Sequence, residues 1–367
     1  MKEIKSLYIH IPFCMQICSY CDFCKMFYNE KMVNDYLEEL ECEINKNYQE
    51  DHLKTIYIGG GTPSSLKPYQ LDKLFSITNR LSIQKEYEFT FECNISDITK
   101  DLLQTLKQNK INRISIGIET INNKFFELIN RSNDKENIKE KIKLVKEYFT
   151  NINIDLMYAF PNETIEDLKN DLDFFKELEV PHISIYSLIL EQNTKLYIYN
   201  TQPIDEELES KMYYYIINYL KSLGYNHYEI SNFSKEGYES KHNLTYWNNE
   251  EYYGFGLSSG GYINNKRYTN TRSLNNYLKG QYIYEEEELD LKTKMENEMI
   301  LGLRKIKGVK KEQFFSKYNF KITDIFDIMD MVDKKLLEDK DGYIYIPEDK
   351  LYLSNYILVN FIGGENE

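Results

Sequence analysis

Strand-like runs and helical patterns alternate along the first two-thirds of this 367-residue chain. The runs expected as strands span residues 7–11, 54–58, 88–92, 113–118, 152–157 and 182–188. The helical patterns that follow them span residues 31–48, 69–80, 99–109, 122–130, 136–149, 165–178 and about 206–223. Short connections between such units predict a parallel sheet with helices outside it. The repetition favours an incomplete (β/α)6 barrel over a doubly wound sheet, and periodicity alone does not separate the two.

The sequence changes character after Gly224. Residues 227–233 resemble one short strand, and residues 241–272 contain few helix formers. The run of glutamates at 285–288 is the best candidate for a linker, because like charges favour a solvated surface. We expect three parts: a partial barrel over 1–225, a sheet extension over 226–288, and a small, mainly helical, winged-helix-like domain over 289–367. In the last part, residues 322–336 have a helical pattern and the alternating residues 343–346 suit a hairpin strand.

Four of the six cysteines fall within eleven residues, directly after the first expected strand. Cys14, Cys18 and Cys21 stand at spacings of four and three, and Pro12 ends the strand, so the cysteines open a loop. A loop with this spacing can bring three thiolates toward one point. They would complete a structural zinc site with a fourth ligand, or bind three irons of a four-iron cluster and leave its fourth iron open. Such clustering in a long chain indicates metal binding rather than a disulfide framework.

Polar features follow several other expected strands. Residues 59–62, Glu92, Glu119 and Asp155 stand at or just beyond strand ends, as Cys14 does. Because such ends meet at one rim of a parallel barrel, they predict an active site there. The glycines leave the backbone bare for a ligand, and a plain βα turn explains them equally well. The proline after Thr62 and the lack of a following Lys-Ser/Thr pair argue against a Walker-type nucleotide site.

Charge and hydropathy exclude two classes of partner. The 59 acidic residues outnumber the 45 basic residues, and the net charge of −14 makes nucleic-acid binding unfavourable. No apolar run approaches the ~20 residues of a membrane span. The first residues lead into a strand without a targeting pattern. We therefore expect a cytoplasmic protein.

The cysteine motif, with Tyr20 before its last cysteine and Gly-Gly-Thr-Pro further on, resembles the radical S-adenosylmethionine superfamily. More of the chain is similar to the oxygen-independent coproporphyrinogen oxidase-like family, in particular to its haem chaperone HemW branch. The segments that carry this likeness are Tyr8-Ile-His-Ile-Pro-Phe-Cys14, Tyr20-Cys-Asp-Phe23, Ile114-Ser-Ile-Gly-Ile-Glu119, Asp155-Leu-Met-Tyr158, Tyr228-Glu-Ile-Ser-Asn-Phe233 and His242-Asn-Leu-Thr-Tyr-Trp247. The likeness covers nearly the whole chain, including the C-terminal helical part.

The resemblance implies specific roles around a cofactor. The three cysteines of the motif would hold a [4Fe–4S] cluster, and S-adenosylmethionine would chelate its open iron. Arg131 would pair with the methionyl carboxylate, a task that suits a planar bidentate donor. The other positions that match cofactor-contacting residues are Tyr8, Tyr20, Gly60, Gly61, Thr62, Glu92, Glu119 and Asp155. Without the cysteine motif, the favoured explanations would be an ordinary helix-end cation for Arg131 and solvated strand-end charges for the carboxylates.

His242 marks a second expected site. An imidazole beside large aromatic side chains suits an axial ligand of haem iron. The resemblance associates the His242-Asn-Leu-Thr-Tyr-Trp247 motif with haem. A structural histidine satisfied by the backbone is the alternative.

Several positions depart from the family pattern. Phe23 stands where the oxidase has a further cysteine, Cys24 stands one place late as a spare thiol, and the N-terminal arm is shorter. These departures favour the chaperone branch over the oxidase. Glu119 stands where a glutamine is usual, which leaves an acceptor without an amide donor. Ala159 and Asn162 replace glycines of a turn.

We therefore expect a haem chaperone that carries the cluster and S-adenosylmethionine and transfers haem to haem-accepting proteins. The alternative is an oxygen-independent coproporphyrinogen III oxidase, which would decarboxylate its substrate to protoporphyrinogen IX through a radical. A third reading is a protein whose cluster is structural. We expect no nucleic-acid partner, a monomer or weak dimer, and membrane contact only through protein partners.

Overall fold

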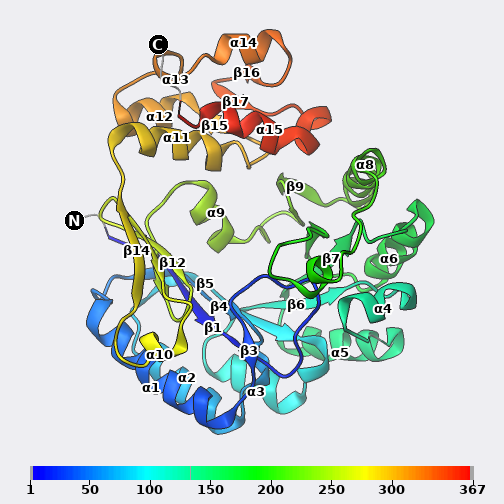
Figure 1. Ribbon diagram of the computed structural model, residues 1–367, viewed down its shortest axis with the longest axis vertical. Coiled ribbons are helices and arrows are strands. Elements are labelled where there is room, and N and C mark those ends of the chain that lie inside the picture. The colour runs from blue at the N-terminus through cyan, green and yellow to red at the C-terminus, as the bar shows by residue number, and fades with distance from the viewer. Residues whose placement is uncertain (1–2, 133, 364–367) are drawn as a thin grey trace.

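The computed structural model describes residues 3–132 and 134–363 (Figure 1). Its largest sheet has nine strands in the order β11-β1-β4-β5-β6-β7-β8-β10-β9. The strands from β1 to β8 in this order are all parallel, and they follow the chain. They are β1 (Ser6–Ile11), β4 (Leu53–Gly60), β5 (Ile83–Asn94), β6 (Arg113–Glu119), β7 (Asn151–Tyr158) and β8 (His182–Ser187). This arrangement confirms the expected parallel sheet and partial barrel.

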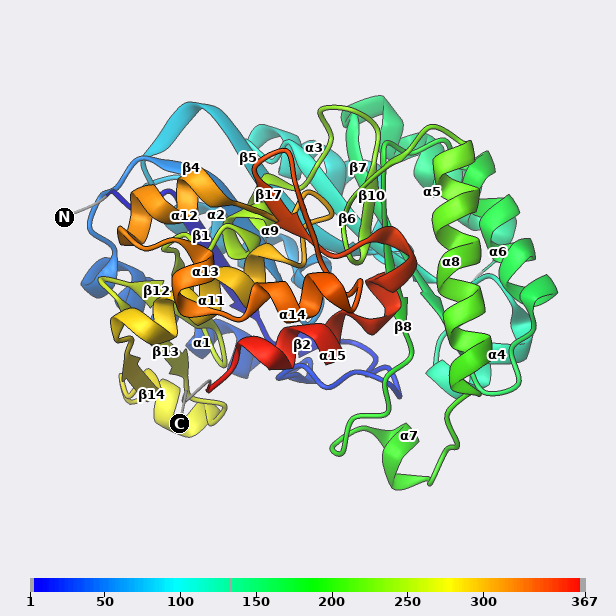
Figure 2. The same cartoon turned by 90° about the horizontal axis from the view of Figure 1, so that it is seen from above.

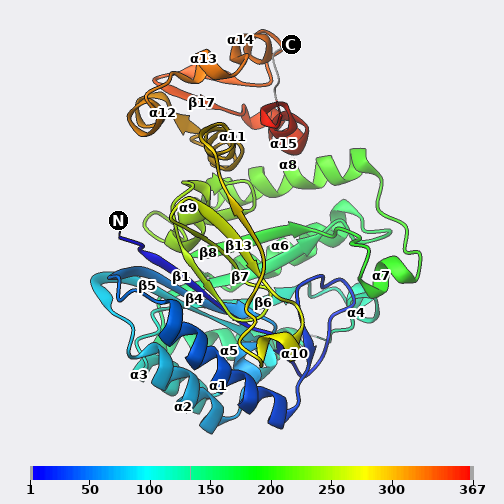
Figure 3. The ribbon, with the colours of Figure 1, turned by 60° about the vertical axis from the view of Figure 1, so that its left-hand side comes forward.

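Helices cover the outer face of this sheet, as Figure 3 shows for α1, α2 and α3. The helices are α1 (Glu30–Asn47), α2 (Pro68–Thr78), α3 (Lys100–Gln108), α4 (Asn123–Ile129), α5 (Lys135–Tyr148), α6 (Ile165–Glu177), α7 (Lys195–Ile198) and α8 (Glu206–Ser222). Side-chain caps mark the start of every helix in this set except α2, which begins at Pro68. Thr99, for example, accepts from the Leu102 N–H, and Thr164 forms a capping box with Asp167. Two single turns of 3-10 helix, η1 (Pro63–Ser65) and η2 (Ile95–Asp97), follow β4 and β5. The short α7 was not expected from the sequence.

The chain after Gly224 differs from the expectation in two places. The single strand expected at 227–233 is a hairpin of β9 (Asn226–Glu229) and β10 (Asn232–Ser234), in which β10 pairs antiparallel with β8. The segment expected to lack helix contains α9 (Lys241–Trp247), followed by β11 (Tyr253–Phe255), which pairs with β1. Two anchors start α9: Ser240 caps it, and the Glu88 carboxylate accepts from its first two backbone N–H groups. Tertiary contacts therefore override the weak helix propensity.

A second sheet replaces the expected linker. It consists of β12 (Gly260–Ile263), β13 (Lys266–Asn270) and β14 (Ile283–Glu288), with α10 (Leu274–Tyr277) between the last two strands. The interpretation of residues 285–288 as a linker was wrong, because these glutamates pair with β13. Their charge is tolerated because β14 is an exposed edge strand, and Lys266 Nζ lies 2.7 Å from Glu286 Oε1.

The C-terminal part lies over α8 and α9 in Figures 1 and 3, and Figure 2 shows it from above. It contains α11 (Leu291–Gly302), α12 (Lys311–Tyr318), α13 (Ile322–Ile325), α14 (Ile328–Asp333), α15 (Ser354–Leu358), η3 (Glu348–Leu353) and η4 (Val359–Phe361). Its sheet has the order β15 (Val309–Lys310), β17 (Tyr343–Tyr345), β16 (Glu338–Lys340). The hairpin strand is as expected, but the helix expected at 322–336 is two helices, because Asp327 starts a new one by capping the Asp330 N–H.

Backbone hydrogen bonds attach this part to the barrel. The Ile230 N–H donates to the Arg304 carbonyl at 3.0 Å, and the Ile306 N–H donates to the Tyr228 carbonyl at 3.2 Å. The Arg304 guanidinium lies over the Trp247 ring, 5.4 Å from its centroid. Trp247 therefore supports the C-terminal part, although it belongs to the same short helix as His242. In the described part of the chain, no helix is both long enough and apolar enough to cross a membrane.

The junction between the two sheets depends on Gly254. A Cβ there would lie 1.8 Å from the Gly260 carbonyl oxygen, which is backbone and cannot rotate away. We predict that Gly254→Ala destabilises the fold by about 1–3 kcal/mol, measured by chemical unfolding. Gly260→Ala on the facing strand is the matched control, because its Cβ would meet no atom closer than 3.8 Å. Equal unfolding midpoints for the two variants would contradict this account.

Candidate functional site

The cysteine loop starts where β1 ends. The short strands β2 (Phe13–Cys14) and β3 (Met26–Phe27) pair in parallel and close the loop. The Gly61 N–H donates to the Ile11 carbonyl at 2.8 Å, and the Thr62 N–H donates to the Phe13 carbonyl at 2.8 Å. A side chain at Gly61 would lie 2.8 Å from that Ile11 oxygen. The glycine turn therefore lies directly against the first cysteine.

A cavity of about 480 Å³ opens between this loop and the carboxyl ends of the strands. We call it the cysteine cavity. It brings together every predicted site residue except Tyr8 and His242. The predicted residues in its lining are Cys14, Cys18, Tyr20, Cys21, Gly60, Gly61, Thr62, Glu92, Glu119, Arg131 and Asp155. The convergence expected at one rim of the barrel is thus present.

The thiols of this cavity are free, as are those of the other cysteines. Burial raises the pKa of Cys14, and a hydrogen bond with Thr62 partly offsets that effect. Burial also raises the pKa of Cys21 to about 11, against the opposing charge of Lys25. Within residues 3–132 and 134–363, no group of three or more His, Cys, Asp or Glu side chains is arranged to hold one metal ion. A four-iron cluster instead takes each thiolate on a different iron, so the three thiols around one cavity fit a cluster.

Glu119 and Arg131 form a buried ion pair beside the cysteines. Arg131 Nη1 lies 2.7 Å from Glu119 Oε2, and the Tyr20 hydroxyl donates to Glu119 Oε1 at 2.9 Å. Glu119 thus acts as an acceptor only, as its carboxylate requires: Oε1 accepts the Tyr20 hydrogen bond, and Oε2 is held by the charge of Arg131. The same guanidinium donates to Cys18 Sγ at 3.1 Å and to the Gly117 carbonyl at 3.2 Å. Arg131 therefore ties the strand end to the cysteine loop.

Burial and charge oppose one another in this pair. Burial raises the pKa of Glu119, and the guanidinium beside it partly offsets that effect. The carboxylate in turn helps to hold the pKa of Arg131 well above its ordinary value. Arg131 therefore stays charged, and it is the partner that makes a carboxylate tolerable at this depth.

Two further carboxyl groups line the cysteine cavity. Glu92 accepts from the Gly60 N–H at 2.9 Å and from the Tyr57 hydroxyl at 2.6 Å. Burial raises the pKa of Glu92. Burial, reinforced by the charge of Glu119, raises the pKa of Asp155 to about 7. When ionised, these groups are acceptors suited to ligand hydroxyls.

Tyr8 and His242 line a neighbouring cavity of about 440 Å³, which we call the tyrosine cavity. The two cavities share Asp22, Phe23 and Glu92 in their linings. The remaining lining residues are Tyr8, His10, Cys24, Tyr57, His242, Asn243, Tyr246, Tyr252, Ser258, Ser259, Gly260 and Arg272. Tyr8 therefore lines this second cavity rather than the cysteine cavity, with its hydroxyl hydrogen-bonded to His10 Nδ1 at 2.9 Å.

His242 is almost completely buried, with 1% of its surface exposed. Its Nδ1 lies 2.9 Å from the Thr55 hydroxyl, and its Nε2 lies 2.8 Å from the Tyr246 hydroxyl. Burial, with the charge of Arg113, lowers the pKa of His242 to about 3. The imidazole is therefore neutral, as an iron ligand requires, and both of its nitrogens have hydroxyl partners.

Sequence reasoning missed several lining residues. His10 and Tyr57 had a detectable signal, because His10 lies two residues after Tyr8 on the same expected strand and Tyr57 lies in the next expected strand. The observed β1–β4 register sets Tyr57 beside Tyr8. Lys25, whose Nζ donates to the Cys21 carbonyl, lies in the loop next to the motif. Arg272 had no such signal, because it follows β13 in a segment without regular pattern.

The turn after β7 has left-handed backbone at both positions where the family resemblance implies glycine. Ala159 has φ +65° and Asn162 has φ +61°, both in the left-handed region. Asparagine adopts this conformation readily, whereas for alanine it raises the conformational free energy by about 1–2 kcal/mol. Both positions therefore adopt a conformation that glycine would enter without strain.

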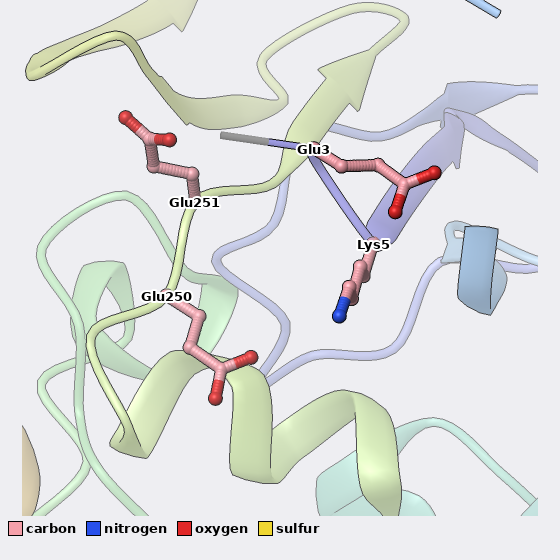
Figure 4. A pocket seen from close by; sticks show the side chains of 4 residues that line it. All are labelled: Glu3, Lys5, Glu250 and Glu251. Carbon is pink, nitrogen blue, oxygen red and sulfur yellow. The ribbon is translucent and has the colours of Figure 1, made fainter. Parts of the chain in front are cut away.

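A third hollow, of about 250 Å³, lies away from the cysteines (Figure 4). It is lined by Glu3, Lys5, Glu250 and Glu251. None of the predicted site residues contributes to it, so the chemistry remains with the other two cavities.

Comparisons with known proteins agree with this geometry. Residues 8–175 match the Radical SAM superfamily. The heme chaperone HemW of Lactococcus lactis subsp. lactis (strain IL1403) is 38% identical over 99% of this chain and 98% of that protein. HemW of Bacillus subtilis (strain 168) is 37% identical over 98% of this chain and 100% of that protein. The solved structure of coproporphyrinogen III oxidase (HemN) from Escherichia coli, described as a radical SAM enzyme, has a TM-score of 0.86 over 98% of this chain and 90% of that chain; at 20% identity it shows the fold.

The buried ion pair leads to a prediction about stability and pH. Arg131→Ala leaves the Glu119 carboxylate buried without its cation, which costs about 3–5 kcal/mol when the group is ionised. The loss of stability should be larger at pH 8 than at pH 5. In the folded variant the uncompensated Glu119 binds a proton more tightly than in the unfolded chain, which releases it above a pKa of about 4.3. Each rise in pH between these two pKa values therefore favours the unfolded state. Chemical unfolding of the cluster-free protein at both pH values measures this.

The matched control is the double variant Arg131→Ala/Glu119→Gln. Because it removes the buried charge, it should recover part of the stability and lose most of the pH dependence. If the Arg131→Ala variant and the double variant have the same free energy of unfolding at pH 8, Arg131 does not stabilise the buried Glu119 carboxylate.

Proposed function

The chain belongs to the heme chaperone HemW family of the radical SAM superfamily, and from that membership we propose that it binds haem and transfers it to haem-accepting proteins. The observation that carries the proposal is the pair of adjoining cavities, one lined by the cysteine motif and one by aromatic side chains. Near-full-length identity of 37–38% to proteins named heme chaperone HemW supports it.

We propose that the cysteine cavity holds the [4Fe–4S] cluster and S-adenosylmethionine. Cys14, Cys18 and Cys21 would bind the cluster, and the glycine turn with Thr62 would face the methionyl end of the cofactor. When bound, such a cluster supplies an electron to the sulfonium of the cofactor. The chain's own contribution is placement: Arg131 fixes the loop through Cys18, and Glu92 fixes the turn through the Gly60 N–H.

Arg131 has two competing roles in this proposal. The family resemblance assigns it to the cofactor carboxylate, whereas the structure pairs it with Glu119. A guanidinium has five N–H donors, so it can serve Glu119 and a second carboxylate together. Glu119 would then set the position of Arg131, and Tyr20 would support Glu119.

We propose that haem occupies the tyrosine cavity with His242 as its iron ligand. The neutral imidazole suits this role. Iron binding at Nε2 requires the Tyr246 hydroxyl to leave that nitrogen, while Thr55 keeps its bond to Nδ1 and orients the ring. Hydrogen bonding at the second nitrogen is the usual support of a histidine ligand.

The alternative is oxygen-independent oxidation of coproporphyrinogen III. The likeness of fold to HemN and the complete cysteine motif favour it. Phe23 opposes it, because this side chain stands where the oxidase has a further cysteine and is 63% exposed at the boundary of both cavities. We further propose a cytoplasmic location, a monomeric or weakly dimeric state, and membrane contact only through protein partners.

Anaerobic reconstitution followed by separate titrations with haem and coproporphyrinogen tests the proposal. We expect about four irons per chain in the reconstituted protein. We also expect saturable haem binding and no protoporphyrinogen. The triple variant Cys14→Ser/Cys18→Ser/Cys21→Ser should lose the cluster iron and still bind haem, because the haem site lies in the other cavity.

His242→Ala should abolish haem binding, and His52→Ala is its matched control because His52 is an exposed histidine paired with Glu3. Absorption spectra of the haem complex report both variants. Formation of protoporphyrinogen in the presence of reductant would instead establish the oxidase. Unchanged haem binding in His242→Ala would remove His242 as the ligand.

A further inference from the structure

Arg272 is the one Lys or Arg among the described residues that line the tyrosine cavity. It lies two residues beyond β13, and its side chain is exposed. Its Nη2 donates to the Asp22 carbonyl at 3.2 Å, and the guanidinium also interacts with the Cys24 side chain. A guanidinium has five N–H donors, which is more than these two contacts use.

The cavity behind Arg272 is lined by aromatic rings. The Tyr8 and Tyr57 ring centroids are 6.0 Å apart, and those of Tyr246 and Tyr252 are 4.6 Å apart. The Tyr57 ring also lies 5.2 Å from the His242 ring. Such walls favour a flat aromatic ligand, because ring faces and edges pack against it.

The cations of the cysteine cavity are already engaged. Arg131 is paired with Glu119, and Lys25 donates to the Cys21 carbonyl. Five carboxylate side chains also line that cavity: Asp22, Glu92, Glu119, Asp155 and Glu191. In the proposed function any spare donors of Arg131 serve the cofactor carboxylate. A flat anionic cargo is therefore better served at the tyrosine cavity, where an exposed guanidinium meets aromatic walls and Asp22 and Glu92 are the acidic side chains in the described lining.

We propose that Arg272 anchors a carboxylate of the tetrapyrrole cargo, with the macrocycle against the tyrosines of this cavity. Haem carries two propionate groups, and a guanidinium binds a carboxylate in a bidentate manner. The inference rests on the proposed haem-binding function and adds to it a specificity residue and an orientation. The cargo carboxylate then lies beside Asp22 and Cys24, on the loop that carries the cluster cysteines.

Arg272→Gln in the full-length protein tests this inference. We expect it to bind haem about tenfold more weakly or worse, because a charge-assisted hydrogen bond is lost. Affinity for the iron porphyrin dimethyl ester, whose carboxylates are masked, should not change. Arg272→Lys should recover part of the haem affinity, because it keeps the charge and loses the bidentate geometry. Absorption titrations with both porphyrins measure these affinities.

Arg267→Gln is the control. Arg267 lies on β13, contacts Asn249 and lies over the Tyr262 ring, outside the cavity lining. It should bind haem as the unaltered protein does. The inference is overturned if Arg272→Gln binds haem with unchanged affinity, or if its affinities for haem and for the dimethyl ester fall by the same factor. If the unaltered protein binds neither porphyrin, the proposed haem-binding function fails as well.

Discussion

The backbone pairing of β1 with β4 continues beyond both strands, and the rest of the site depends on it. The Gly61 and Thr62 N–H groups donate hydrogen bonds to the carbonyls of Ile11 and Phe13. The glycine turn and the cysteine loop therefore form one unit. A side chain at Gly61 would prevent this pairing. Parallel neighbours then add Glu92, Glu119 and Asp155 at the same rim. One register therefore sets the shape of the cysteine cavity.

The two cavities are adjacent because Glu92 belongs to both. Its carboxylate accepts from the Gly60 N–H on the side of the glycine turn and from the Tyr57 hydroxyl on the side of the tyrosines. The exposed Phe23 forms another part of the shared lining. A cofactor in one cavity and a tetrapyrrole in the other would thus lie on the two sides of one buried carboxyl group. In this arrangement Phe23, which stands in place of a cysteine, would offer the proposed cargo an apolar surface instead of a thiol.

Local patterns in the sequence predict the barrel and most of the cysteine cavity. Buried parallel strands read as apolar runs, and their shared direction places Cys14, Glu92 and Asp155 together. The features that sequence reasoning missed depend on contacts between distant segments. Helix α9 forms because Glu88 anchors its first turn, and the glutamates of β14 form a strand because β13 pairs with them. The pairing of Glu119 with Arg131 is equally invisible in a pattern of single residues.

In the proposed function, one chain holds a cluster and a haem in separate, adjoining cavities. Anomalous scattering at the iron edge, from crystals of the reconstituted protein with haem, tests it most directly. We expect two iron-containing sites: a four-iron cluster beside Cys14, Cys18 and Cys21, and a single haem iron in the tyrosine cavity beside His242. Haem iron located in the cysteine cavity, or on the outer surface of the protein, would contradict it.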